Sequence, residues 1–221
     1  MIDVPVFYNN KRISSGNVKD YLLRKFPQFD KIQSVKSNTI IMDNLLQKNY
    51  GKDNDCSLTS ITECVMYHYM KNKNSYTIEK ELNAEEVYAT VEQIADKYFY
   101  NGDNYGTIPV FIKNIYDETL QHYKINYKTK QKYFKNIGYS LSKIKELVDR
   151  KIPVIWSIFK DGRDYYNSHT ITVKGYQEFE LTNSTTGTKK HVTMLIIQDH
   201  WSKVISYVDF DFISCISAIN Y

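Results

Sequence analysis

The stretch Asn54-Asp55-Cys56-Ser57-Leu58-Thr59-Ser60-Ile61 marks the point where a polar loop gives way to a helical pattern of apolar residues. The pattern runs over residues 57–70, and Asp55 or Asn54 is placed to cap the start of that helix. Cys56 would then lie in the first turn, where unpaired backbone N–H groups and the helix dipole favour the thiolate, the nucleophilic form. The sequence therefore indicates a reactive cysteine, with a small buried core residue as the alternative.

The segments around this stretch predict an α+β fold. Helical periodicity predicts further helices at residues 18–26, 84–100, 108–123 and 140–150. After Lys151 the pattern changes, and strands are expected at residues 153–159, 168–175, 192–199 and 204–212, with a hairpin connection at 183–187. A short strand or packed segment is also expected at residues 40–42. Helices first and antiparallel strands later are typical of an α+β fold rather than an alternating α/β fold.

Length and composition fit one folded domain. The chain has 221 residues, 42% of them hydrophobic, which is enough for a core and argues against disorder. We expect a single domain over residues 1–221, with a helical lobe at about residues 18–150 and a sheet lobe at about residues 151–221. The net charge of +4 is spread along the chain without a long basic block, so nucleic acid is not an expected partner.

The three cysteines form an odd set, which rules out a complete disulfide framework. Cys64 would lie ~12 Å along the same helix from Cys56, too far for a disulfide, and both Cys64 and Cys215 have apolar neighbours typical of core residues. Neither a signal peptide nor a membrane span is predicted. The compartment stays open between the cytoplasm and secretion after removal of a signal.

A nucleophilic cysteine needs a base within hydrogen-bond reach, and the chain has five histidines. His169 opens an alternating strand, which would bring it to the interior at one end of the sheet, although a structural histidine is the competing interpretation. His68 would lie ~18 Å from Cys56 along one helix. His122 closes a helix and His191 lies at a polar strand end, so both are expected at the surface.

Asp199 continues the apolar face of the strand predicted at residues 192–199. A carboxylate on a buried face is costly without a partner, and an imidazole N–H is a suitable one. His200 would point to the opposite face of this strand, which makes it a weaker candidate for the base. The order of cysteine at a helix start, histidine opening a strand and aspartate ending the next strand is hard to obtain from core packing alone.

Four segments carry a resemblance to the papain-like cysteine peptidases, in particular to the bacterial branch similar to bacteriocin-leader peptidases. These segments are residues 54–61, 141–157, 169–176 and 196–201. The resemblance implies a papain-like fold in which a helical lobe packs on an antiparallel sheet. It also implies Cys56 as nucleophile, His169 as general base and acid, and Asp199 as the residue that orients His169. No cofactor is implied, and the substrate would be a peptide or a related amide, cleaved through a thioester.

The chain departs from the family pattern at three positions. Ser57 replaces the usual glycine after the cysteine, and His200 replaces the proline that often follows the aspartate. Tyr50 stands where the family has its oxyanion glutamine. Gln47, which could serve if the loop bulges, and Asn54 are the candidate oxyanion donors, together with the Cys56 backbone N–H.

These departures leave two alternative functions open: a papain-like binding module with impaired catalysis, and an acyl or peptidyl transferase using the same cysteine. Zinc binding is not predicted, because no paired spacing such as Cys-x-x-Cys or His-Glu-x-x-His occurs. The eight glycines are dispersed and form no phosphate-binding loop. Substrate identity and oligomeric state do not follow from the sequence.

Overall fold

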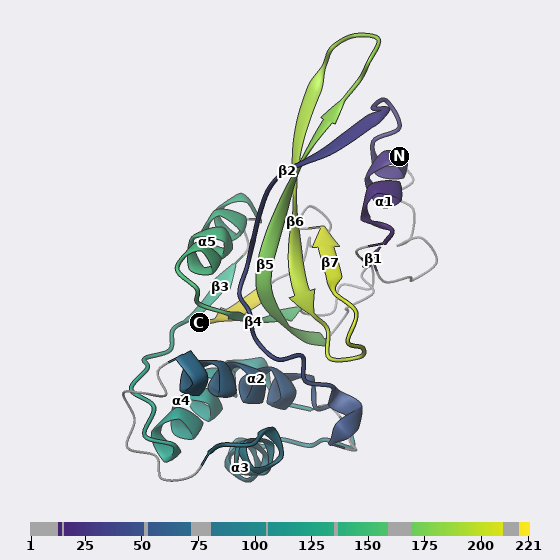
Figure 1. Ribbon diagram of the computed structural model, residues 1–221. Helices are drawn as coiled ribbons and strands as arrows, with labels where there is room; N and C mark the ends of the chain where they lie inside the picture. The colour runs from purple at the N-terminus through teal and green to yellow at the C-terminus, as the bar shows by residue number, and fades with distance from the viewer. Residues whose placement is uncertain are drawn as a thin grey trace.

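The computed structural model describes residues 13–14, 16–50, 53–71, 81–104, 106–134, 137–158, 169–209 and 217–221. Within them the α-helices are α1 (Val18–Lys25), α2 (Cys56–Lys71), α3 (Ala84–Asp96), α4 (Ile112–His122) and α5 (Ile137–Asp149), and short 3-10 helices cover η2 (Gln47–Asn49) and η4 (Pro109–Phe111). The strands are β1 (Ile13–Ser14), β2 (Lys31–Thr39), β3 (Gln131–Phe134), β4 (Val154–Ile158), β5 (His169–Thr182), β6 (Lys189–Gln198), β7 (Ser206–Asp209) and β8 (Ser217–Asn220). Figure 1 shows α2, α3 and α4 grouped at one end of the sheet, which confirms the α+β prediction.

The strands form one antiparallel sheet in the order β1-β7-β6-β5-β4-β8-β3, with β2 paired to β5 off this path. β5 pairs with three other strands, β2, β4 and β6. Its first half pairs with β4, from Val154↔Val173 to Ile158↔His169, and its second half pairs with β2. The second half of β5 and the facing part of β6 project beyond the rest of the sheet as a long hairpin (Figure 1).

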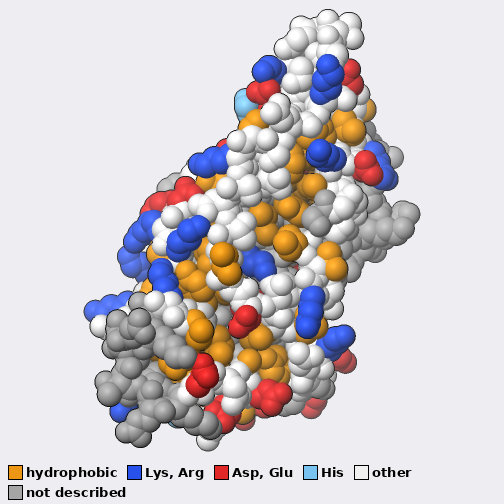
Figure 2. Space-filling model, in the orientation of Figure 1, with side chains coloured by type: hydrophobic (Ala, Val, Ile, Leu, Met, Phe, Trp, Pro, Cys, Tyr) orange, Lys and Arg blue, Asp and Glu red, His pale blue; other side chains and the backbone are white. Residues whose placement is uncertain are grey.

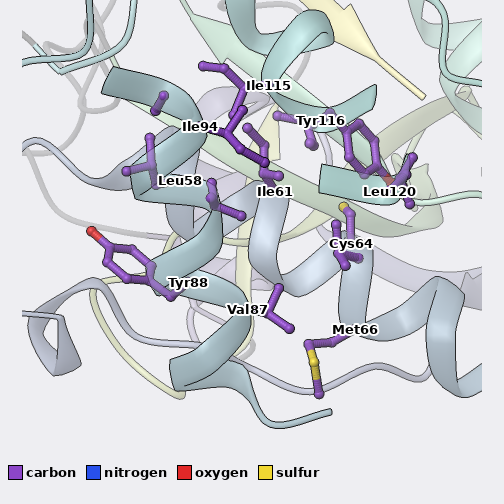
Figure 3. Close-up of a cluster of buried hydrophobic side chains, with 14 of the residues drawn as sticks. Leu58, Ile61, Cys64, Met66, Val87, Tyr88, Ile94, Ile115, Tyr116 and Leu120 are labelled. Atoms are coloured by element: carbon purple, nitrogen blue, oxygen red, sulfur yellow. The ribbon is translucent and has the colours of Figure 1, made fainter. Parts of the chain in front are cut away.

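The helical end of the molecule has its own core. Side chains of α2, α3 and α4 pack together there, and the α2 residues Leu58, Ile61 and Cys64 are fully buried among them (Figure 3). Each apolar side chain of this size removed from water contributes about 1.5–3 kcal/mol, so these contacts fix the direction of α2. The cysteine at the first turn of α2 is thereby held on a rigid element.

Two further cores cover the sheet. α5 packs over β4 and β5 around Trp156, Ile171 and Val173, and α1 packs over the distal half of β5 and β6 around Leu22 and Phe179. α1 and β2 therefore belong to the sheet part of the molecule although they precede residue 151, the boundary expected between the two lobes. β3 also precedes that boundary and pairs with β8 at the sheet edge.

The expected positions of the helices agree with the structure, but some details were wrong. Residues 40–42 form no strand: the strand is β2, which ends at Thr39, while Ile40 packs into the core and its N–H donates to the Lys174 carbonyl oxygen at 2.6 Å. α3 ends at Asp96 rather than at residue 100, since Phe99 has a φ of 60°, which a helix cannot continue. Cys215 lies outside the described residues.

The surface view adds no single-sign charge patch to this picture. Figure 2 shows lysine and arginine side chains scattered singly over the face of Figure 1, in keeping with their even spread along the sequence. Among the described helices, none has the length and apolar composition that a membrane crossing requires.

Candidate active site

Cys56 is the first residue of α2 and is partly exposed. The Thr59 N–H donates to the Asp55 carbonyl oxygen at 2.8 Å and closes the first helical turn around the cysteine. The following residue, Ser57, donates its hydroxyl to Thr107 Oγ1 at 2.7 Å, which ties the helix start to the segment before η4. Cys56 thus has the position at a helix N-terminus that favours a thiolate.

Aromatic residues hold the loop before Cys56 against α3. Asp55 is fully buried and accepts a hydrogen bond from the Tyr100 hydroxyl. Tyr50, at the position where a glutamine was expected, stacks on Tyr88 of α3 with ring centroids 3.9 Å apart. Tyr50 thus packs its ring against α3.

His169 and Cys56 lie against each other across the junction of β5 and α2. Burial alone would raise the pKa of the Cys56 thiol, but the charge of His169, its hydrogen bond and hydrogen bonds from Thr170 outweigh burial and lower that pKa. Burial alone would lower the pKa of His169, yet the charge and hydrogen bond of Cys56, with contributions from Asp199, raise it. The opposite shifts are those of a thiolate paired with an imidazolium.

Asp199 meets His169 through its main chain. His169 Nε2 lies 2.9 Å from the Asp199 carbonyl oxygen, which can only accept, so Nε2 carries the hydrogen and Nδ1 is left for Cys56. The Asp199 carboxylate accepts from the Trp201 N–H at 3.1 Å and from the Ser206 hydroxyl at 3.0 Å. These two hydrogen bonds hold the turn that presents the Asp199 carbonyl to His169.

Trp201 covers this pair of residues. Its ring stacks on the His169 imidazole with centroids 4.2 Å apart and an interplanar angle of 23°. The indole is 38% exposed, so it lies between the imidazole and solvent. Shielding of this kind strengthens the hydrogen bond between His169 and Asp199, because water competes with it less.

The two oxyanion candidates differ in their surroundings. The Gln47 side chain is buried, and its amide nitrogen donates to the carbonyl oxygen of Asp53, three residues before the nucleophile. The Asn54 amide nitrogen donates to the Gly102 carbonyl oxygen at 3.0 Å, which turns it toward another loop. The 3-10 helix η2 begins at Gln47, and this local winding is what brings Gln47 close to the start of α2.

A model of the Peptidase_C39 like family matches residues 38–210, a range that contains the five residues predicted for the site. The chain belongs to the Peptidase_C39 like family. The match confirms the assignment to the papain-like cysteine peptidases and their fold. No curated protein sequence matches the chain closely enough to be reported.

For a Peptidase_C39-like chain, the remaining histidines need other roles. His68 is buried on α2 and stacks on Tyr127 with centroids 3.8 Å apart; burial lowers its pKa to about 4. His122 ends α4 and is exposed, as expected. His191 is exposed on β6, 3.6 Å from Glu180. His200 was expected on the far face of its strand and is instead fully buried behind the site.

The surroundings of His200 contain the polar residues that sequence reasoning missed. β5 presents Thr170 and Thr172 to α2, which presents Ser60 and Glu63, and all four side chains are buried. Alternation of threonine with isoleucine and valine in β5 is ordinarily a sign of one solvent-facing side, so no sequence signal marked this face. Within the described residues, no cluster of three or more histidine, cysteine, aspartate or glutamate side chains could hold a metal ion.

Gly106 supports the loop beside Asn54 and gives a first testable prediction. Its φ is +68°, and a Cβ there would lie 2.6 Å from the Asn54 carbonyl oxygen. Gly187 has a similar φ of +71° with nothing within 4 Å, so it isolates the backbone effect. We expect Gly187→Ala to cost about 1–2 kcal/mol of unfolding free energy and Gly106→Ala to cost about 1–3 kcal/mol more. Urea denaturation measures both; equal losses would mean that residues 101–106 do not depend on contact with Asn54.

Proposed function

We propose that this protein is a thiol-dependent hydrolase, a cysteine peptidase that cleaves a peptide or related amide bond through a thioester. The observation that carries the proposal is the partly exposed residue Cys56 against the buried His169, with the pKa of the thiol lowered and that of the imidazole raised. Membership of a peptidase family supports the same reaction. A core cysteine has no need of such a partner, and buried Cys64 shows the contrast, because burial raises its pKa well above the usual value.

In the proposed reaction the Cys56 thiolate attacks the carbonyl carbon of the scissile bond. The protonated Nδ1 of His169 then gives its proton to the leaving amine, and the carbon–nitrogen bond breaks to leave a thioester. His169, now neutral, takes a proton from water as the water attacks the thioester. The acid is released, and the thiolate and imidazolium are restored. No cofactor enters this sequence.

Negative charge develops on the substrate oxygen in both steps and requires donors. We assign this role to the Gln47 side-chain amide and the Cys56 backbone N–H. The Gln47 amide group has two N–H bonds, and one of them donates to the Asp53 carbonyl oxygen, which holds the amide beside the start of α2. Loss of one such donor raises the barrier by about 3 kcal/mol. Asn54, engaged with Gly102, is the weaker candidate.

The proposed role of Asp199 is to hold His169 through its carbonyl oxygen, and this yields a prediction. Asp199→Asn keeps the carbonyl and an acceptor for the Trp201 N–H but removes the charge that helps raise the pKa of His169. We expect it to lower kcat/KM by about tenfold, a one-unit change in pKa. Asp199→Ala also removes the anchors of the turn, and a further loss of about tenfold is expected.

A carboxylate that itself accepts the imidazole N–H behaves differently, since its amide variant loses about 10⁴-fold in kcat. A loss of that size in Asp199→Asn would contradict the main-chain role proposed for Asp199.

The experiment that tests the function is cleavage of a mixture of unstructured peptides in H₂¹⁸O, followed by mass spectrometry. Hydrolysis is expected to place ¹⁸O in each new C-terminal carboxylate, and Cys56→Ala should give no such products. Products joined to an added amine, without ¹⁸O at the new bond, would indicate a transferase. No cleavage at any site by the folded wild-type protein, with any peptide or small amide, would leave the binding module as the better account.

A further inference from the structure

His200 contacts the segments that carry Gln47, Cys56 and His169. Its Nδ1 lies 3.1 Å from the Leu45 carbonyl oxygen, and its Nε2 lies 2.8 Å from Ser60 Oγ and 3.2 Å from Thr172 Oγ1. Its own carbonyl oxygen accepts from the Gln47 N–H at 2.9 Å. His200, which lies in the turn after β6, thus contacts the segment before η2, the first turns of α2 and strand β5.

Each of these contacts joins His200 to a segment that carries a residue of the proposed mechanism. Ser60 Oγ, besides meeting His200, donates to the Cys56 carbonyl oxygen at 2.9 Å. Thr172 lies on the same strand as His169, and Asp199 precedes His200 in the chain. A shift of His200 would therefore reach nucleophile, base, orienting residue and oxyanion donor together.

A carbonyl oxygen only accepts, so Nδ1 of His200 carries a hydrogen toward Leu45, while Nε2 faces the hydroxyls of Ser60 and Thr172. Burial lowers the pKa of His200 to about 3, with the charges of His169 and Lys174 acting in the same direction and the Leu45 contact opposing them. The ring is neutral at any pH at which the protein would work.

The titratable groups that face this imidazole come from each neighbouring element. From α2, Glu63 Oε2 lies 4.0 Å from Nε2, and burial raises the pKa of Glu63 to about 8, opposed by a Thr172 hydrogen bond and the charge of Lys174. Lys174 is on β5, and Asp43, which lies before η2, further raises the pKa of Glu63. The surroundings thus hold Glu63 largely protonated near neutral pH, next to a neutral His200.

The backbone at His200 is held in an unusual conformation. Its φ is 63°, in the left-handed region that residues other than glycine rarely adopt. Proline, with φ fixed near about −65°, could not take this conformation. Such outliers persist only where the surroundings over-determine them, and here three side-chain contacts and a buried position do so.

We infer that His200 is a positioning residue: its neutral imidazole fastens the turn bearing Asp199 to the segment bearing Gln47, to the first turns of the helix bearing Cys56 and to the strand bearing His169. The inference rests on the proposed function for its catalytic meaning, whereas the fastening itself is a property of the fold. It acts through other residues and touches no substrate.

The test compares three variants. His200→Gly keeps the left-handed backbone and removes the ring, and His200→Asn keeps the backbone and a donor toward Leu45. His68→Asn is the matched control, because it changes another buried imidazole, which lies near the end of α2 and stacks on Tyr127. Two quantities are measured on each: the rate of Cys56 alkylation by iodoacetamide from pH 4 to pH 9, and amide hydrogen exchange at residues 45–47, 56–60 and 169–172.

In His200→Gly, alkylation at pH 6 is expected to slow by about tenfold, which corresponds to a one-unit rise in the pKa of the thiol. Exchange should accelerate in all three segments together, His200→Asn should restore part of both properties, and His68→Asn should change neither. A folded His200→Gly protein with the wild-type alkylation profile and unchanged exchange overturns the inference. If His200→Gly does not fold, His200→Asn and Ser60→Ala replace it, and wild-type behaviour in both would be equally decisive against it.

Amide hydrogen exchange reports on the contacts of His200 independently of catalysis, so a loss of these contacts can be told apart from a failure of the proposed function. If wild-type Cys56 alkylates no faster than a free thiol, the proposed function fails on its own. Simultaneous loss of protection in the three segments of His200→Gly would then still support the fastening, and unchanged protection would still overturn it.

Discussion

Replacing Cys56 by alanine is expected to lower kcat by about 10⁶-fold, to the level left by binding and the oxyanion donors alone. Cys64, the other cysteine among the described residues, is buried in the helical core, away from a substrate. The measurement is release of a peptide product under single-turnover conditions, with enzyme in excess.

The control for this variant is Cys64→Ala. It removes another sulfur from the same helix but leaves the site untouched. Its activity should therefore stay within a few-fold of wild type after correction for any unfolded fraction. Activity that survives Cys56→Ala and is lost in Cys64→Ala would mean that Cys64, and not Cys56, is the nucleophile.

Replacing His169 by alanine is expected to lower kcat/KM by about 10²- to 10⁴-fold, the range for loss of a general acid–base group. The pH dependence should change as well. In the wild type, activity falls on the acid side as the thiolate is protonated, at a lowered pKa, and on the alkaline side as His169 loses its proton, at a raised pKa. Without His169 the alkaline fall should disappear, and residual activity should rise with pH toward the ordinary pKa of a cysteine.

His191→Ala is the matched control for His169→Ala, because His191 is exposed on the same sheet and interacts with Glu180 far along the hairpin. It should keep the full bell-shaped profile. A bell-shaped profile in His169→Ala would mean that another group supplies the proton.

The sequence predicted the helices, and the place of Cys56 at the start of one of them, well because both depend on local patterns. Apolar spacing after Cys56 is helical, and the buried positions Leu58, Ile61 and Val65 agree with it. β2 was not predicted, since its side chains are mostly exposed and polar, and its strand conformation comes from pairing with β5. Local propensity does not indicate that a segment will pair with a strand more than a hundred residues away.

Site details that depend on backbone geometry were also beyond the sequence. Strand parity placed the Asp199 carboxylate in the interior, where it lies, but β6 ends at Gln198, and strand parity could not predict that the turn which follows also brings the Asp199 carbonyl to His169. Counting residues before Cys56 reached Tyr50 as the position of the oxyanion donor. The winding of η2 and the hydrogen bond of Gln47 to Asp53 favour a residue three positions earlier.

No sequence pattern predicted that polar side chains would be buried together behind the site. Ser60, Thr172 and His200 are separated by long stretches of chain, and each is an ordinary polar residue in its local context. Only the packing of α2 against β5 brings them together. This is why His200 could be mistaken for a weak candidate base.

The central claim is that His169 keeps Cys56 as a thiolate, and the alkylation rate of Cys56 against pH tests it most directly. Iodoacetamide reacts with the thiolate alone, so the midpoint of the profile reports the pKa of the thiol. For the wild type we predict fast, stoichiometric labelling of Cys56 at pH 6, with a midpoint well below the value of about 8.5 for a free cysteine; for His169→Ala we predict slow labelling at pH 6 and a midpoint near that value. A wild-type midpoint equal to that of a free thiol, or one unchanged by His169→Ala, would contradict the account.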